Sequence, residues 1–415
     1  MGTRRLLIVL AGGLAALVLI GGGVVAALAF MLVRAPTSAS QLLVLGDDQQ
    51  IRLVPDGGTT EVVAADASSD LFRYPSVTPD GRFIAYISSD EQGFAIVRLD
   101  IRSGEKRELY RSRDNPPLYL SWSPDGKFVS FLTNMRTGGL GIHVVNANGS
   151  RPSDLIGTTM GTSYFAWRPD GSTLLVHTGG NQFQEGRMSS YSPGSTQPEA
   201  LRTDPGLFQA PAWSMSGREF YYVAQPVVEG GLTVDQVESV LTRVAADGSN
   251  PQPLVSERGA ALFFARAPQS DQIAYTTVSP AGFGSLKLID STSGASTAIS
   301  TAGEQVAAFF WAPDGQRIAY ISVSPPESGQ PLQYIWHVVP VGGGKVQDFD
   351  SFVPSQAFAA MLNYFDAYAI SLQLWSANSV ELVYGAADGV YVLNTRSGKT
   401  RRAADGVLGM WVERL

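Results

Sequence analysis

The residue types that most often carry catalysis are sparse in this chain of 415 residues. It has no cysteine, which excludes disulfides, thiolate metal sites and a cysteine nucleophile. Its three histidines, which could bind a metal ion or act as general bases, are His143, His177 and His337. They lie in separate strand-like segments with no ligand spacing between them. The sequence therefore predicts strand histidines with hydrogen-bonded neighbours.

Motifs for hydrolysis and phosphate binding are also missing from the sequence. An α/β-hydrolase needs a Gly-x-Ser-x-Gly turn, and the chain contains none. The glycine-rich segment 342–345 ends in a lysine but lacks the strand–loop–helix context of a phosphate loop. Aspartates recur before glycines, but each fits a turn and none belongs to a calcium-loop pattern. We therefore predict no catalytic, cofactor-binding or metal-binding residues and no enzymatic activity.

The dominant feature of the sequence is a repeat. Segment 121–132, SWSPDGKFVSFL, has close copies that start at residues 76, 166 and 310, and divergent copies that start at 212, 265 and 374. In the motif, proline sets φ at the second turn position, and glycine adopts the left-handed conformation that follows a type I turn. The turn residues of the close copies are Asp80 and Gly81, Asp125 and Gly126, Asp170 and Gly171, and Asp314 and Gly315.

A large aromatic residue precedes most of these turns. The tryptophans at this position are Trp122, Trp167, Trp213, Trp311 and Trp375. A large aromatic at a fixed place in a repeat is typical of packing between neighbouring sheets. The segments after the turns, such as residues 82–87, have apolar residues on both faces, which indicates strands covered on both sides.

The spacing of the repeat predicts its architecture. The steps from Asp80 to Asp125 and from Asp125 to Asp170 are both 45 residues. Each copy is followed by further strand-like runs and a glycine-containing turn, so that one repeat holds four short antiparallel strands. This length matches one blade of a β-propeller. We therefore predict an all-β fold, a β-propeller of four-stranded blades.

The number of blades depends on the two ends of the propeller domain, which we place at residues 42–415. Residues 42–63 hold three strand-like runs without a preceding aromatic-and-turn strand. Residues 407–412 resemble an isolated first strand, with Trp411 in the tryptophan position. Joining the two ends would give one composite blade beside seven continuous ones and would remove free sheet edges. The sequence thus favours eight blades, with seven as the alternative.

The pattern W-S-P-D-G-x-x-[ILV]-[AV]-[FY] resembles the WD40-like (PD40) repeat of TolB-type propellers. It is also similar to the propeller domain of dipeptidyl peptidase IV-type enzymes. The resemblance covers nearly all of residues 42–415 and implies the propeller architecture and, through TolB, a role in protein contacts. No catalytic residue of the peptidases can be carried over, because the hydrolase motif is absent. The fold hosts binding proteins, scaffolds, lyases and peptidase accessory domains, so it assigns no function by itself.

The N-terminal region has the composition of a membrane anchor. Residues 6–33 form 28 consecutive positions without a charge. At about 1.5 Å per residue, a helix of that length exceeds the roughly 30 Å hydrocarbon core of a bilayer. We predict a short tip and a single transmembrane helix over residues 1–34, a linker over 35–41, and a propeller on the extracytoplasmic side. Cleavage as a signal peptide, which would give a secreted protein, is the alternative.

One segment departs from the repeat. The step from Asp314 to Asn378 is 64 residues, and the excess lies at about residues 346–372. Its apolar residues follow helical spacing, which predicts an amphipathic helix after Pro354. The helix would either pack on the rim of the propeller or dock a partner, since insertions in repeat proteins gather on the binding face. The candidate docking residues are Phe352, Phe358, Met361, Leu362, Phe365 and Tyr368.

Charge and composition limit the functions further. The formal net charge is −7 and no basic run is present, which disfavours nucleic acid as a partner. Our leading hypothesis is a membrane-anchored extracytoplasmic propeller that binds protein, as an adaptor or as a subunit of an envelope complex, without a cofactor. The alternatives are a carbohydrate-active enzyme, either a lyase or a glycosidase, and a sensor of a glycan or small ligand, each with its site in the central channel.

Overall fold

The computed structural model describes residues 41–412 except residues 56–58, 180–185, 207–208, 226–237, 291–292 and 325–330. The predicted anchor (residues 1–34) and nearly all of the predicted linker (35–41) lie outside the described residues. Within the described part of the chain, no helix combines the length and apolarity needed to cross a bilayer.

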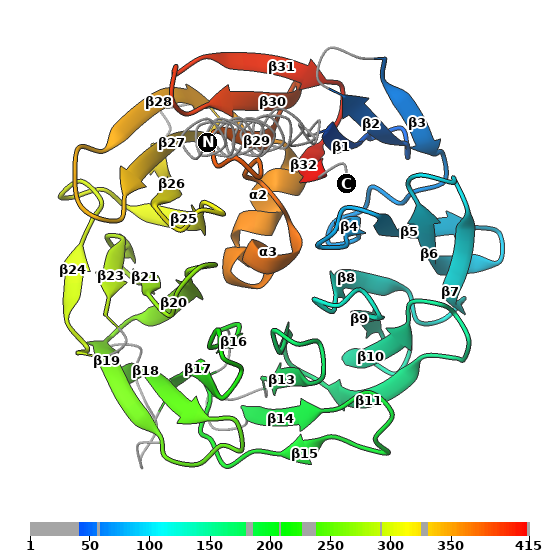
Figure 1. Ribbon diagram of the computed structural model, residues 1–415, viewed down its shortest axis with the longest axis horizontal. Helices are drawn as coiled ribbons and strands as arrows, with labels where there is room; N and C mark the ends of the chain where they lie inside the picture. The colour runs from blue at the N-terminus through cyan, green and yellow to red at the C-terminus, as the bar shows by residue number, and fades with distance from the viewer. Residues whose placement is uncertain are drawn as a thin grey trace, which may run out of the picture. The chain divides into compact units, whose positions relative to one another are not determined.

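Eight antiparallel sheets follow one another around a central axis, so that the described chain forms an eight-bladed propeller (Figure 1). We number the blades in chain order, starting from the composite blade. Blade 2 consists of β4 (Ser76–Val77), β5 (Phe83–Asp90), β6 (Gly93–Asp100) and β7 (Lys106–Ser112). Blade 3 consists of β8 (Pro117–Trp122), β9 (Phe128–Asn134), β10 (Leu140–Asn146) and β11 (Asp154–Thr159). Blade 4 consists of β12 (Ser163–Trp167), β13 (Leu174–Thr178), β14 (Arg187–Tyr191) and β15 (Glu199–Ala200).

The remaining continuous blades vary in strand number. Blade 5 consists of β16 (Ala212–Trp213), β17 (Glu219–Ala224), β18 (Glu238–Ala245) and β19 (Gln252–Arg258). Blade 6 consists of β20 (Ala261–Arg266), β21 (Ile273–Ser279), the short β22 (Gly282–Phe283), β23 (Lys287–Ile289) and β24 (Ser296–Ala298). Blade 7 consists of β25 (Val306–Trp311), β26 (Arg317–Ser324), β27 (Gln333–Pro340) and β28 (Gln347–Phe352). Blade 8 consists of β29 (Glu381–Ala386), β30 (Gly389–Asn394) and β31 (Thr400–Ala404), with a Trp375–Leu382 bridge in place of an inner strand.

Blade 1 is built from both ends of the propeller, as the sequence predicts. Its strands are β1 (Gln41–Leu45), β2 (Ile51–Pro55), β3 (Glu61–Ala64) and β32 (Leu408–Val412). β32 pairs antiparallel with β1, and Leu43 lies opposite Met410. The residues of β1 and β32 are buried, so this pairing closes the ring with a hydrophobic strand pair. Eight blades, and not the alternative of seven, are therefore present.

The repeated turns have the geometry that their sequence predicts. Gly126 has φ of 68°, and its N–H donates to the carbonyl oxygen of Ser123 over 2.9 Å. The Asp125 carboxylate accepts from the Ser123 hydroxyl (2.7 Å) and from the backbone N–H of Lys127 (3.2 Å). The equivalent glycines Gly81, Gly171 and Gly315 have φ of 68°, 72° and 67°. Each of these turns needs a residue that tolerates positive φ, which explains the glycine.

The tryptophan before each turn joins its blade to the preceding one. Trp122 donates its Nε1–H to the carbonyl oxygen of Ser76 in blade 2 over 3.0 Å. Four other tryptophans repeat this bond: Trp167 to Ser130 Oγ, Trp213 to Ala166 O, Trp311 to Ala265 O and Trp375 to Phe310 O. Blade 6 carries Arg266 at this position, and its Nε–H donates to Trp213 O over 2.7 Å. Six of the eight described blades thus hydrogen-bond to their neighbour through one repeat position.

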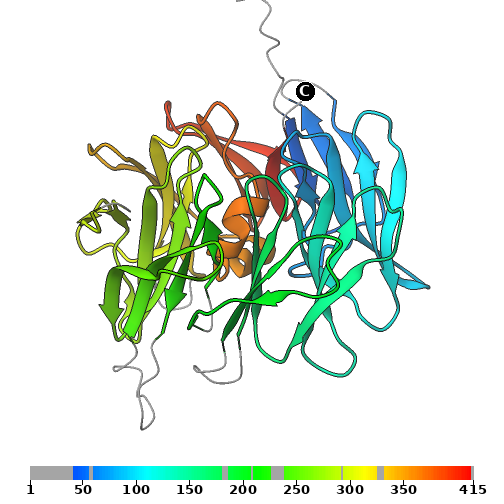
Figure 2. The same ribbon diagram turned by 60° about the horizontal axis from the view of Figure 1, so that its bottom comes forward.

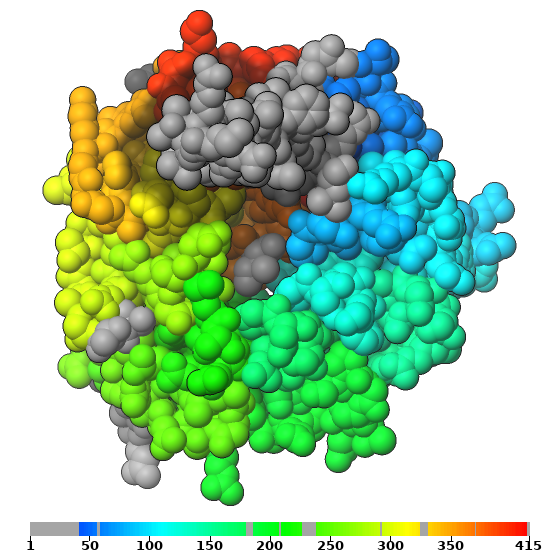
Figure 3. Space-filling model, viewed as in Figure 1, coloured from blue at the N-terminus to red at the C-terminus, as the bar shows by residue number. Residues whose placement is uncertain are grey.

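The inserted segment forms two short helices, α2 (Gln356–Leu362) and α3 (Phe365–Ser371), in the middle of the ring (Figures 1 and 2). The Ser355 hydroxyl caps α2 by accepting from the backbone N–H of Phe358 over 3.1 Å. The single predicted helix is thus interrupted at Asn363 and Tyr364. Its predicted position on the rim is wrong, because both helices lie inside the channel, where Figure 3 shows them at the base of the central hollow.

We expect the inter-blade tryptophan bond to contribute measurably to stability. Trp213→Phe removes the N–H donor that reaches Ala166, whereas Trp411→Phe removes an Nε1–H that has no hydrogen-bond partner among the described residues. Both side chains are 4% exposed, so the loss of ring volume is matched. Denaturant unfolding should show Trp213→Phe to be more destabilising by about 1 kcal/mol. Equal losses for the two variants would contradict a contribution from the bond.

Candidate functional site

The side chains of α2 and α3 hold the centre of the propeller together. Phe358 lies against Trp336 of blade 7, with ring centroids 6.2 Å apart. Phe365 contacts Phe309 of blade 7 at 4.9 Å. Tyr368 packs edge-on against Tyr119 of blade 3 at 5.1 Å. Tilted and edge-to-face ring pairs of this kind are favourable beyond the area that they bury. The helices therefore form an aromatic hub that contacts several blades at once.

The residues predicted to dock a partner belong to this hub and are not available on the surface. Phe358 and Met361 are 0% exposed, and Leu362, Phe365 and Tyr368 are also buried. Phe352 is partly covered at the end of β28, where its ring lies 4.4 Å from that of Tyr384. The docking prediction is therefore wrong in its premise of an exposed aromatic cluster. Helical periodicity shows that a face is apolar, but it does not show what covers that face.

Hydrogen bonds from three blades fix the two helices. The Tyr74 hydroxyl donates to the carbonyl oxygen of Ala357 over 3.0 Å, and the Tyr119 hydroxyl donates to that of Ala367 over 2.9 Å. The backbone N–H of Ala210, just before blade 5, donates to the Asp366 carboxylate over 2.8 Å. These bonds attach the backbone of both helices, and the first-turn carboxylate of α3, to segments that lead into or form three different blades.

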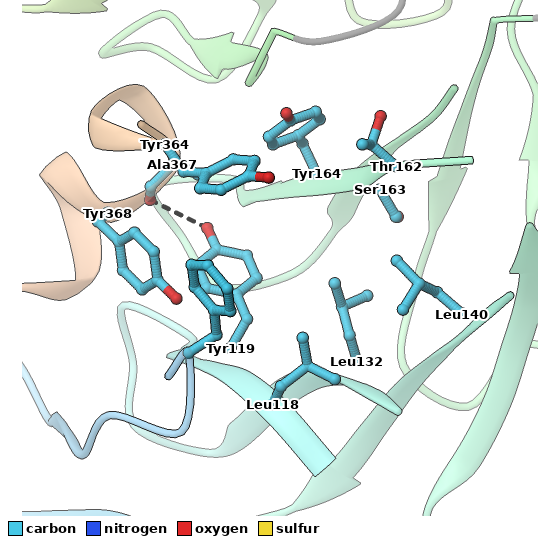
Figure 4. Close-up of a pocket in the computed structure, with 11 residues that line it drawn as sticks. Leu118, Tyr119, Leu132, Leu140, Thr162, Ser163, Tyr164, Tyr364, Ala367 and Tyr368 are labelled. Atoms are coloured by element: carbon cyan, nitrogen blue, oxygen red, sulfur yellow. Dashed lines mark hydrogen bonds between the residues drawn. The ribbon is translucent and has the colours of Figure 1, made fainter. Parts of the chain in front are cut away.

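A cavity of about 190 Å³ remains between α3 and blades 3 and 4 (Figure 4). Its wall is aromatic and aliphatic, and hydroxyl groups supply most of its polar side-chain atoms. The lining residues are Phe72, Leu118, Tyr119, Leu132, Leu140, Thr162, Ser163, Tyr164, Tyr364, Ala367 and Tyr368. Figure 4 shows the rings of Tyr164 and Tyr364 at one end and the three leucines at the other. We call this cavity the tyrosine pocket.

The backbone is strained at two residues of the tyrosine pocket. Phe72 has φ of 65° and Tyr119 has φ of 50°, values that bulky residues rarely adopt. The Tyr119 N–H donates to the carbonyl oxygen of Phe72 over 2.8 Å, which ties the two together. The β8–β9 pairing shifts register between Leu118 and Ser121, so a bulge turns Tyr119 out of the ladder and toward α3. Bulges and strained residues concentrate at binding sites, where they aim a side chain.

Burial dominates the electrostatics of this region. It raises the pKa of Asp366 to about 6, although the N–H groups of Ala210 and of the first turn of α3 favour the ionised form. Burial also raises the pKa values of Tyr119, Tyr164 and Tyr368 above the usual range, so these hydroxyls stay protonated at physiological pH. The lining of the tyrosine pocket contains no carboxylate and no cation, the groups that a glycosidase or lyase uses.

The three histidines have the hydrogen-bonded neighbours that the sequence predicts. His143 Nε2 lies 3.2 Å from Thr133 Oγ1, and His177 Nδ1 lies 2.7 Å from the carbonyl oxygen of Gln209. His337 differs, because its Nδ1 faces the carboxylates of both Asp348 and Glu304. Sequence reasoning missed this group because its three members lie on separate segments of the chain. The sequence offered one indication of this group: the strand that follows His337 carries an acidic residue, Asp348, at the position that pairs with the histidine.

The comparisons with known proteins support the fold and no specific function. No family model matches the sequence, and no curated protein matches it. The chain is an eight-bladed β-propeller. An oligogalacturonate lyase in complex with manganese is 12% identical, with a TM-score of 0.50 over 88% of this chain and 84% of that one. A prolyl endopeptidase is 10% identical, with a TM-score of 0.52 over 83% of this chain and 51% of that one.

TolB, whose repeat this sequence resembles, is also among the similar solved structures. TolB from Acinetobacter baumannii is 13% identical, with a TM-score of 0.43 over 79% of this chain and 82% of that one. The similarities to the lyase and to the peptidase lie at identities at which only architecture is shared. The activity named for the lyase and for the peptidase is therefore that of those proteins.

We expect the hub to behave as core in mutagenesis. Phe365, at 3% exposed, touches rings of two blades, whereas Phe283 on β22 is 36% exposed. Phe365→Ala should lower the free energy of unfolding by about 3–5 kcal/mol, because it removes a buried ring and leaves a cavity. Phe283→Ala should cost about 1 kcal/mol or less. Chemical denaturation measures both, and similar small losses would show that the hub is not packed as described.

The raised pKa of Asp366 makes stability depend on pH in a defined direction. Below the ordinary pKa of 3.8 the carboxyl is protonated in the folded and unfolded states. Between pH 3.8 and about 6 the folded state retains the proton, so stability falls as pH rises; above about pH 6 the full penalty remains. A shift of this size corresponds to a penalty on the order of 3 kcal/mol.

Asp366→Asn, which mimics the protonated acid, should therefore raise the melting temperature at pH 7.5 and change it little at pH 4. Glu199→Gln on the exposed strand β15 controls for the change in net charge. A variant that melts below the parent protein at pH 7.5 would show that the ionised carboxylate stabilises the fold.

Proposed function

We propose that this chain is a non-enzymatic sensor that binds one small, mostly apolar molecule in the tyrosine pocket. The observation that carries the proposal is the pairing of an aromatic cavity with the strained residues Phe72 and Tyr119 in its wall. Strain of this kind persists only where the surrounding structure enforces it. In this protein, hydrogen bonds and ring contacts to α3 enforce the position of Tyr119.

The size and lining of the tyrosine pocket indicate the class of ligand. Drug-sized ligands occupy pockets of about 300–1,000 Å³, whereas an apolar cavity of about 150 Å³ accepts benzene. A volume of about 190 Å³ therefore fits a single aromatic ring with a small substituent. The tyrosine rings offer faces and edges for ring packing. The Ser163 hydroxyl donates to the carbonyl oxygen of His177 over 3.3 Å and keeps a lone pair that can accept from one polar group of the ligand. A glycan, which carries many hydroxyls, would leave most of them unpaired.

For the cellular location and the partners of this sensor, we propose what the sequence predicts. The uncharged stretch over residues 6–33 supports an anchored propeller on the extracytoplasmic side of a membrane. An adaptor role toward another protein is a further prediction, but the hub residues no longer support it, because they are buried.

The proposal is tested with p-cresol as the probe, a single ring with one hydroxyl. Titration followed by ligand-observed NMR should give a dissociation constant on the order of 0.1–1 mM, which corresponds to about 4–5.5 kcal/mol. Leu140→Trp fills the leucine end of the tyrosine pocket and should abolish saturable binding. Leu155→Trp, at a side chain that is 51% exposed on β11, is the matched control and should bind as the parent does.

Melting temperatures close to that of the parent protein establish that both variants are folded. Saturable p-cresol binding that survives Leu140→Trp would place the ligand elsewhere. Absence of binding to the parent protein at 10 mM probe, about ten times the weakest expected dissociation constant, would refute the proposed ligand class.

A further inference from the structure

We propose that Glu304, His337 and Asp348 form a binding site for a divalent transition-metal ion, such as Zn²⁺ or Mn²⁺, on blade 7. The site shares no residue with the tyrosine pocket and does not depend on the function proposed for it. One imidazole nitrogen and two carboxylate oxygens converge there, and their ligand atoms all lie within 4.8 Å of one another. This donor set suits zinc and manganese, whereas calcium and magnesium prefer oxygen alone.

The separations between the donor atoms are close to those around a bound ion. His337 Nδ1 lies 2.9 Å from Asp348 Oδ1 and 3.8 Å from Glu304 Oε1. Metal–ligand distances of about 2.0–2.2 Å place neighbouring donors about 3.0 Å apart in octahedral geometry and about 3.4 Å apart in tetrahedral geometry. An ion therefore requires shifts of only about 1 Å or less from the two carboxylates, which is within the reach of side-chain rotation.

Hydrogen bonds and a ring contact from neighbouring residues fix the orientation of His337 and Glu304. His337 Nε2 lies 2.8 Å from Ser322 Oγ, and the imidazole stacks on the Tyr320 ring with centroids 4.6 Å apart. The other oxygen of Glu304, Oε2, accepts hydrogen bonds from the Tyr320 hydroxyl and the Thr301 N–H. Nδ1 and Oε1 are thus the atoms directed to the common point. Outer partners of this kind orient metal ligands and are typical of functional metal sites.

The fold brings the three ligands together from separate segments. His337 on β27 and Asp348 on β28 are direct partners in the strand register, and Glu304 lies in the connection that leads into β25. His337 is buried, whereas the Asp348 side chain is 67% exposed. A metal ion could therefore enter from solvent and keep water in its remaining positions. Bound there, it would tie the β24–β25 connection to the outer strands of blade 7.

The competing arrangement is a metal-free hydrogen bond in which Nδ1–H donates to Asp348. A metal ion takes the place of that proton on Nδ1, and the neutral imidazole then carries its proton on Nε2, which can donate to Ser322 Oγ. Zinc should bind more tightly than manganese at the same donors, following the usual order of affinities.

The test uses the full-length chain, treated with chelator and titrated calorimetrically with ZnCl₂. One equivalent should bind, and the melting temperature should rise with zinc concentration. Asp348→Asn, at an exposed position where folding is not at risk, should weaken binding at least about tenfold. Asp350→Asn removes another exposed carboxylate from the same strand and should leave the affinity unchanged. His337→Gln provides a second ligand variant.

The proposal is overturned if the parent chain shows no saturable binding up to 1 mM zinc, about the weakest affinity that a dedicated site would have. It is also overturned if Asp348→Asn weakens binding by less than about tenfold, or if Asp350→Asn weakens it equally. Either of these results would show that zinc binds to scattered surface carboxylates. The three residues would then serve only the hydrogen bond from His337 Nδ1–H to Asp348.

Discussion

The space at the centre of the ring is the constraint on which the rest of the structure depends. Eight blades surround an axis that the inner strands of a wide propeller do not fill with their own side chains. In this chain α2 and α3 occupy it (Figure 2), and rings from blades 2, 3, 6 and 7 pack against them. The tyrosine pocket is the volume that this packing leaves between α3 and blades 3 and 4.

The blades around this hub are joined at one repeat position, which hydrogen-bonds six of the eight described blades to the preceding blade. Each of the tryptophans at this position packs between two sheets and also hydrogen-bonds to the preceding blade. The motif that forms the turn therefore also joins neighbouring blades. Arg266 keeps the bond although it replaces the aromatic ring, which indicates that the N–H donor matters at this position as well as the ring. Blade 1 is joined to its neighbour in another way. Trp411 donates its backbone N–H to the carbonyl oxygen of Gln373, and the β1–β32 pairing closes the ring.

Local patterns predicted the blades, but the site depends on contacts that have no local signature. The proline–aspartate–glycine turns, the tryptophans and the 45-residue step gave the architecture, because turn chemistry and strand alternation act within a few residues. The position of Phe358 and Phe365 on the ring axis could not be read from their spacing, because spacing does not identify the covering surface. The bulge at Tyr119 has no glycine to mark it, and Glu304 meets His337 only through the folding of blade 7.

The inserted segment forms the core of the propeller, and hydrogen exchange tests this central claim most directly. Backbone amides in α2 and α3 should exchange only on global unfolding, with protection equal to that of the inner strands β8 and β12, because the hub contacts several blades at once. Mass spectrometry of peptides that cover residues 356–371 measures this in the native protein. Exchange as fast as that of the exposed turn at residues 342–345 would contradict the account and would show that residues 356–371 are not part of the core.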